Sequence, residues 1–423
     1  MRLELGIIKI EDVQFGEETT VRNGTLYVNK KELIGLVRQD DRLSEVDVEL
    51  TRPGEEVRIM PVKDVIEPRV KVSGSAELFP GIIGKIGTLG SGRTNVLRGA
   101  AIVTVGRIVG YQEGLIDMSG PGAQYSPFSQ TNNVALILHP IHGLAPHAHE
   151  EAVRLAGLRA AVYLGKTAKD LAPDELEVYE LNPVTDTTLP RVAYVHPLLS
   201  EGLLHDTYLY GVDAKRILPS LIHPNEVMDG AIVSGNCVSA CDKHTTYHHL
   251  NNPVIKELYR RHGKDLNFIG VVISNLNVTL ADKERSSDYA SKLVKLIGAE
   301  GAIITEEGFG NPDTDLMMLC KKIEEYGIKT VLITDEYAGR DGGSQSLADA
   351  VPQADAVISV GNANEVIDLP PMKRIIGDLK RAEVIAGGFV GCLSTDGGLN
   401  IEIQAIMGST CQLGFGTLTA GGY

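Results

Sequence analysis

The last third of the chain alternates apolar runs with stretches of helical spacing, and this alternation constrains the fold more strongly than any other feature of the sequence. Strands that are apolar throughout and alternate with helices are typical of a parallel sheet that helices cover on both faces. The expected strands are residues 268–273, 302–305, 330–334 and 356–360, and the expected helices lie near 286–296 and 315–326. The sequence therefore predicts an α/β fold for this part.

The earlier part of the chain divides into a β-rich start and a first α/β region. Asn23-Gly24 is a hairpin signal between short β-rich runs, and a short helix is expected at 31–38. Further strands are expected at 100–105, 134–138, 191–195 and 231–233, with a helix near 149–164. We therefore expect a small β-rich N-terminal domain at 1–75, an α/β domain at 76–236, and a second α/β domain with a parallel sheet at 237–423.

The composition excludes several classes of partner. A net charge of -15 repels nucleic acids and anionic membranes, so we expect neither as a partner. No uncharged apolar run approaches the roughly 18 residues that span a bilayer, and the first residues do not resemble a signal peptide. Five cysteines without a framework spacing are typical of a reducing compartment, so a cytoplasmic location is expected.

The stretch 229–253 carries the densest chemistry of the chain. An apolar run ending at Val233 is followed by Ser234-Gly235-Asn236, which places Cys237 on a tight loop just past a strand. A thiol there can attack the carbonyl of Asn236, and elimination and hydrolysis would then cut the chain and leave a pyruvoyl group. An Asn-Cys pair in a loop is more commonly a plain turn, so the spacing alone leaves both interpretations open.

Metal binding is a second interpretation of the same stretch. Besides Cys237 and Cys241 it holds three histidines, His244, His248 and His249, and all are zinc-ligand types. The spacing departs from the usual Cys-x2-Cys hairpin and no second cysteine pair follows, so we expect no resident metal. An uncut subunit stabilised by zinc through Cys237, Cys241 and His248 stays as the alternative.

Other side chains are expected to contact a substrate. Arg93 lies in a glycine-rich loop that could hold a carboxylate or equally be a linker, and Lys243 follows the central cysteines. His205 precedes Asp206, which could orient it. Asn311 belongs to the polar loop at 306–311, which with Asp335 and Arg340 follows the expected parallel strands, where such sheets bind ligands. Most of the remaining histidines of the first half are expected to have no chemical role; they are His139, His142, His147, His149, His196 and His223.

Segments spread over nearly the whole chain resemble one family. They include QEGLIDMSGP at 112–121, LLHDTYLYGVDAK at 203–215, SGNCVSACDK at 234–243 and ITEEGFGNPDTDLMM at 304–318. In this order they resemble the precursor of the α and β subunits of substrate-binding component B of the glycine and sarcosine reductases. The same family includes betaine reductase and, more distantly, D-proline reductase.

The resemblance implies a definite chemistry for the central stretch. It implies a cut between Asn236 and Cys237, with Cys237 becoming a pyruvoyl cofactor that captures glycine or sarcosine as a Schiff base. Its expected partners are a second component B subunit that contains selenocysteine, the selenoprotein component A, and component C, which forms acetyl phosphate. Betaine has a quaternary nitrogen and could not form a Schiff base. A pyruvoyl-dependent decarboxylase would share the cofactor but would need a different whole-chain resemblance.

Overall fold

The computed structural model describes residues 1–74, 76–107, 113–235 and 239–414. Asn236 and Cys237, the expected cleavage site, lie outside the described residues. The helices are α1 (Lys30–Val37), α2 (Pro146–Gly165), α3 (Pro224–Met228), α4 (Thr246–Leu250), α5 (Pro253–Arg261), α6 (Leu280–Leu296) and α7 (Asn311–Glu324). No helix among these residues is long and apolar enough to cross a membrane.

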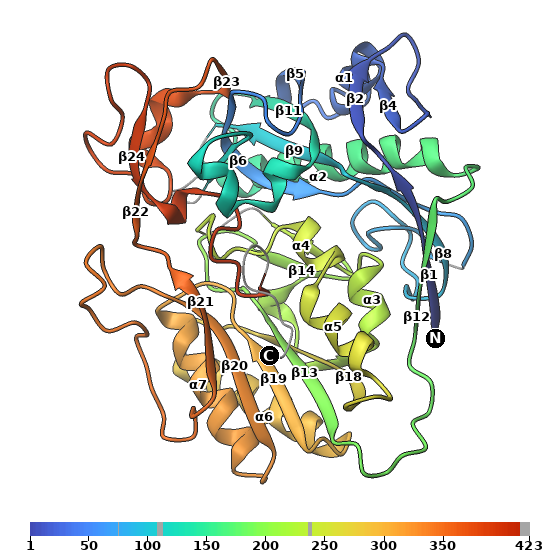
Figure 1. Cartoon of the computed structure of the whole chain (residues 1–423), viewed down its shortest axis with the longest axis vertical. Coiled ribbons are helices and arrows are strands. Elements are labelled where there is room, and N and C mark those ends of the chain that lie inside the picture. The colour runs from blue at the N-terminus through green and yellow to red at the C-terminus, as the bar shows by residue number, and fades with distance from the viewer. Residues whose placement is uncertain (75, 108–112, 236–238, 415–423) are drawn as a thin grey trace.

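A six-stranded sheet forms the lower half of the molecule in Figure 1. Its order is β16 (Ser220–Ile222), β18 (Asn267–Asn275), β13 (Arg191–Leu198), β19 (Gly301–Thr305), β20 (Lys329–Glu336) and β21 (Val357–Asn362). All neighbouring pairs are parallel except β16 with β18 at one edge. The parallel sheet predicted from the alternation of apolar runs is therefore confirmed.

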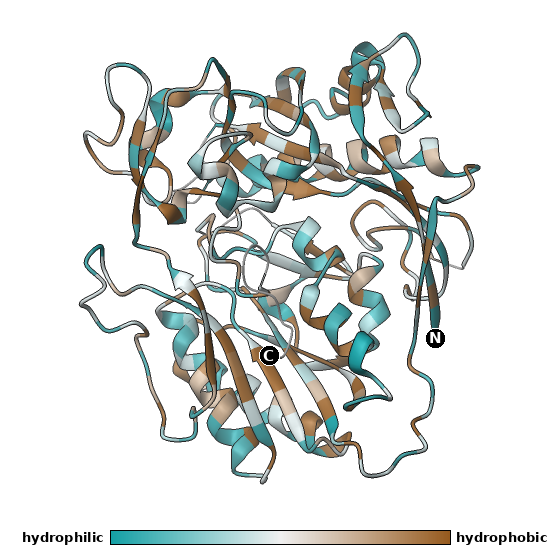
Figure 2. Ribbon diagram, in the orientation of Figure 1, coloured by the Kyte–Doolittle hydropathy of each residue, from teal (hydrophilic) through white to brown (hydrophobic). Residues whose placement is uncertain are grey.

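Helices cover both faces of this sheet. Alternate residues of a strand point to opposite faces, so one strand can contribute to the apolar layer on each side. Val195, Val272 and Ile304 share one apolar cluster with residues of α6 and α7. Val271 and Ile273 instead share a cluster with residues of α5. Figure 2 shows the apolar strands in brown and large teal areas on α6 and α7, as expected for helices with one side in solvent.

A second large sheet lies in the upper half of Figure 1 beside α2. Its order is β10 (Gly114–Asp117), β6 (Val57–Ile66), β9 (Ala100–Gly106), β11 (Asn132–Pro140) and β5 (Leu43–Thr51), and β23 (Arg374–Gly377) also pairs with β6. Next to it runs the sheet β12 (Glu175–Glu180), β1 (Arg2–Lys9), β8 (Gly92–Arg98) and β7 (Arg69–Lys71). Three smaller sheets complete the described strands. The first is β2 (Asp12–Phe15), β4 (Thr25–Val28) and β3 (Thr20–Arg22), and the second is β15 (Val212–Asp213), β14 (Thr207–Leu209) and β17 (Ile232–Ser234). The third pairs β22 (Val366–Leu369) with β24 (Leu399–Glu402).

Strand pairing crosses both of the expected domain limits, near residue 75 and at residue 236. From the first 75 residues, β1 pairs with β8 and β12, and β5 and β6 join a sheet with β9 and β11. From the middle region, β13 lies between β18 and β19 of the lower sheet. The apolar pattern of a strand does not identify the strands that it pairs with, so the sequence does not predict these long-range pairings.

Candidate active site

The strand β17 leads directly to the predicted cleavage site. It pairs antiparallel with β14, so that Ser234 lies opposite Thr207, and it ends at Ser234. The backbone N–H of Gly235 then donates to the carbonyl of Asp206 at 2.6 Å. The predicted strand end before Asn236 is confirmed, whereas the cut itself concerns residues outside the description and stays a prediction.

Only glycine fits at position 235. A Cβ built on Gly235 would lie 1.9 Å from the carbonyl oxygen of His205, far inside any real contact. Gly235, the residue before Asn236, is therefore in close contact with the backbone of His205 and Asp206.

Lys243 is buried beside the same backbone. Its ammonium donates to the carbonyl of Asp206 at 2.7 Å and to the hydroxyl of Thr207 at 3.1 Å. It also lies 3.2 Å from a carboxylate oxygen of Glu307, and both side chains are almost completely buried. A buried charge needs such a partner, and Glu307 and Lys243 supply each other with one.

Glu307 follows β19 and is a central acceptor of the site. Its two oxygens accept the backbone N–H groups of Leu199 at 2.9 Å and His244 at 3.0 Å. Burial raises the pKa of Glu307, but the charge of Lys243 and the backbone N–H groups of Leu199 and His244 together outweigh it, and the pKa is lowered. Glu307 therefore stays ionised. The sequence analysis included it in the polar loop 306–311 but did not single it out, although its place at the carboxyl end of a parallel strand is the signal for such a residue.

Three buried histidines lie next to this ion pair. His196 comes from β13, His244 precedes α4, and His249 lies within α4; one nitrogen of each falls within 4.8 Å of the others. Nε2 of His196 is 3.3 Å from Nδ1 of His249. The sequence analysis did not connect His196 with the central stretch; the long-range insertion of β13 into the lower sheet brings its end there.

The two described members of the alternative zinc set, Cys241 and His248, have different neighbours. Cys241 belongs to a second buried group with Asp242 and Asp335, and its sulfur is 3.1 Å from the hydroxyl of Tyr337. His248 instead packs against Phe128, with 5.0 Å between ring centroids. The alternative set also needs Cys237, which lies outside the described residues, so it stays a prediction.

His205 has a different partner from the one expected. Its Nδ1 lies 2.5 Å from a carboxylate oxygen of Asp213, while the carboxylate of Asp206 accepts the N–H of Gly202 at 2.8 Å. Although they are adjacent in sequence, His205 and Asp206 therefore have different partners. His205 lines a surface pocket of about 640 Å³ together with His147, and Asp206 is buried.

Arg93 pairs with Glu4 across β8 and β1, at 2.8 Å and 3.0 Å. The glycine-rich loop beside it does bind a carboxylate, but that carboxylate is the chain's own Asp229, which accepts from Gly90 N and Thr94 Oγ1 at 2.9 Å and 2.6 Å. The contacts of Arg93 thus lie apart from those of Lys243.

The residues expected beyond the parallel strands separate in the structure. Asp335 is buried and accepts from Thr410 and Gln412 at 2.8 Å and 2.7 Å. Asn311 is exposed and contacts Asn277, and Arg340 pairs with Glu402 on the surface. Of these residues, Asp335 lies in the buried group that also contains Cys241 and Asp242.

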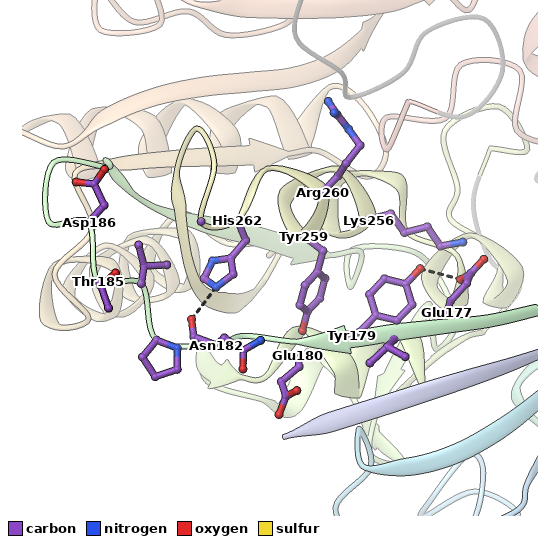
Figure 3. Close-up of a pocket in the computed structure, with 14 residues that line it drawn as sticks. Glu177, Tyr179, Glu180, Asn182, Thr185, Asp186, Lys256, Tyr259, Arg260 and His262 are labelled. Carbon is purple, nitrogen blue, oxygen red and sulfur yellow. Dashed lines mark hydrogen bonds between the residues drawn. The ribbon is translucent and has the colours of Figure 1, made fainter.

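A further pocket of about 630 Å³ lies between β12 and α5. Figure 3 shows Tyr179 of β12 and Tyr259 of α5 side by side in it, with Lys256 beside Glu177 at one end, and the two ring centroids are 5.2 Å apart. Its lining includes none of the side chains that the sequence analysis proposed. We therefore place the candidate site at the buried centre around Lys243 and Glu307.

Comparisons with known proteins give the family. The sequence model of one protein family, the glycine/sarcosine/betaine reductase component B subunits, matches residues 1–421. The chain is 59% identical to glycine reductase complex component B subunits alpha and beta from Acetoanaerobium sticklandii, covering 100% of both chains. It is also 59% identical to the sarcosine reductase complex component B subunit alpha of Peptoclostridium acidaminophilum, and 40% identical to the betaine counterpart there, covering 99% of each chain in both cases. No solved structure matches. The chain belongs to the family of glycine/sarcosine/betaine reductase component B subunits.

Proposed function

We propose that this chain is the substrate-binding subunit of a glycine or sarcosine reductase, an oxidoreductase, and that it is cut between Asn236 and Cys237 so that Cys237 becomes a pyruvoyl group. Relatives named for glycine and for sarcosine are both 59% identical to it, against 40% for the betaine relative. The observation that carries the proposal is that Gly235, next to the cut, and the buried Lys243 donate to one carbonyl oxygen.

The described residues suit the capture of an amino acid. The pyruvoyl carbonyl would supply an electrophile for the amine, which no standard side chain offers. Lys243 would pair with the substrate carboxylate. Glu307 is held ionised next to Lys243 and would accept the proton that the amine must lose. Both groups are buried, so water competes little with either task.

The remaining steps would belong to partner proteins. The sequence contains no selenocysteine, so we propose a second component B subunit that carries one. A selenoprotein, component A, would accept the carbon fragment, and component C would form acetyl phosphate. The relatives are named as parts of reductase complexes, which supports a role within an assembly.

Reductive trapping tests this proposal. The protein is treated with borohydride in the presence of glycine, sarcosine or betaine, and the fragments are analysed by mass spectrometry. Glycine or sarcosine should become fixed at position 237 of the downstream fragment, whereas betaine should not label. The same fragment should resist stepwise amino-terminal degradation, because a pyruvoyl end has no free amine. Labelling of a lysine or of the upstream fragment would exclude the pyruvoyl assignment.

A further inference from the structure

We propose that His196, His244 and His249 bind a divalent transition-metal ion of the zinc type. Their nearest ligand nitrogens all lie within 4.8 Å of one another, and all three side chains are buried. Imidazole is a preferred ligand of zinc, and three histidines leave a tetrahedral ion one open position, as in catalytic zinc sites. The proposed site shares no described ligand with the zinc set expected from the sequence.

The hydrogen bonds of His196 turn one nitrogen toward the cluster. Its Nδ1 lies 2.9 Å from the hydroxyl of Tyr194, and its Nε2 faces Nδ1 of His249 at 3.3 Å, where the two rings share a hydrogen bond that an ion would replace. Two nitrogens bound to one tetrahedral zinc lie about 3.4 Å apart when each Zn–N bond is about 2.1 Å. The spacing of this pair already suits a shared ion, and Tyr194 provides the outer contact that orients metal-binding histidines.

The other two rings carry nitrogens that make no hydrogen bond to the part of the chain that the structure describes. Among the described residues, both ring nitrogens of His244 and Nε2 of His249 are buried without a hydrogen bond. Leaving a buried polar group unpaired costs about 1–3 kcal/mol. A metal ion bound by Nε2 of His196 and Nδ1 of His249 would also satisfy one nitrogen of His244, which gives a reason for burying this imidazole beside the other two.

A carboxylate lies beside the cluster. An oxygen of Glu307 is 3.9 Å from Nδ1 of His244, and Glu307 also pairs with the buried ammonium of Lys243 at 3.2 Å. The carboxylate would attract a divalent ion to the histidines.

Metal analysis of the whole chain tests the site. The protein is incubated with Zn²⁺, freed of unbound metal and assayed for zinc by mass spectrometry. We expect one zinc per chain, and we expect His249→Ala to raise the Kd for zinc more than about 100-fold, beyond the effect of losing an outer contact. His248→Ala is the matched control, because His248 is also buried in α4 but packs against Phe128. Equal zinc retention by the two variants would overturn the proposal.

Two further measurements do not depend on whether His249→Ala folds. X-ray absorption of the zinc-loaded natural protein should show nitrogen ligands at about 2.0–2.1 Å and no sulfur at about 2.3 Å. Tyr194→Phe should weaken zinc binding about 10–100-fold, since it frees the ring of His196. Sulfur ligation would contradict the three-histidine set.

The site is also separable from the proposed cofactor. Cys237→Ala has no thiol to form a pyruvoyl group, but it keeps all three histidines, so it should bind zinc as the natural chain does. Loss of zinc in that variant would make Cys237 a ligand and overturn the set proposed here.

Discussion

Gly235 and Lys243 donate to the same acceptor, the carbonyl oxygen of Asp206, at 2.6 Å and 2.7 Å. One donor is the backbone N–H just before Asn236 and the other is a buried ammonium that also lies 3.2 Å from Glu307. This shared oxygen links Gly235, the residue before Asn236, to the ion pair of the candidate site.

Replacing Cys237 by Ala should give one uncut chain, because alanine has no nucleophile for the Asn236 carbonyl. Gel electrophoresis and intact mass show the result directly. The control is Cys241→Ala, which should still be cut, since burial raises the pKa of the Cys241 thiol and makes it a poor nucleophile. Two fragments from Cys237→Ala would show that the thiol is not required.

Replacing Lys243 by Met should weaken substrate capture and also reduce stability. It leaves Glu307 buried without its cation, which costs about 3–5 kcal/mol when one partner of a buried pair is removed. Trapping yield and denaturant unfolding measure the two effects. Adding Glu307→Gln should restore much of the stability but not the capture. Unchanged capture by the Lys243→Met variant would remove Lys243 from the site.

Replacing Gly235 by Ala should slow or abolish the cut. The new methyl group would meet the carbonyl of His205, and the segment before Asn236 must shift to relieve the clash, at about 1–3 kcal/mol. A time course of fragment formation measures the effect. Gly35→Ala is the matched control, because nothing lies within 4 Å of a Cβ at that position in α1. Normal cleavage of Gly235→Ala would show that the precise path of this segment does not matter.

Asp64 should make stability fall as the pH rises. Burial raises the pKa of Asp64 to about 7 from its ordinary value near 3.8, even though Thr246 and Val65 donate to its carboxyl. The folded state therefore keeps a proton that the unfolded chain releases. Its contribution is complete below the unfolded pKa and is lost between about pH 4 and pH 7, by up to about 4 kcal/mol.

Asp64→Asn tests this directly, because asparagine copies the protonated carboxyl and does not titrate. The variant should gain stability relative to the natural chain between pH 4.5 and pH 7.5, as measured by denaturant unfolding at both values. A difference that does not change with pH would mean that Asp64 keeps an ordinary pKa.

The alternation of apolar runs and helices by itself determined the lower sheet, because strands buried on both faces must be apolar along their whole length. The strands β18, β19, β20 and β21 and the helices α6 and α7 lie where that pattern predicted them. Local signals also placed the end of β17 before Asn236 and the polar loop that contains Glu307.

The tertiary structure alone decided which of these groups meet. It inserted β13 between β18 and β19, which brought His196 to His249, and it turned His205 toward Asp213 rather than Asp206. It also placed the carboxylate of Asp229 against the backbone N–H of Gly90 in the glycine-rich loop. The physical reason is that packing and desolvation select strand partners and buried charge pairs from residues far apart in the sequence. Patterns of neighbouring residues do not specify such partners.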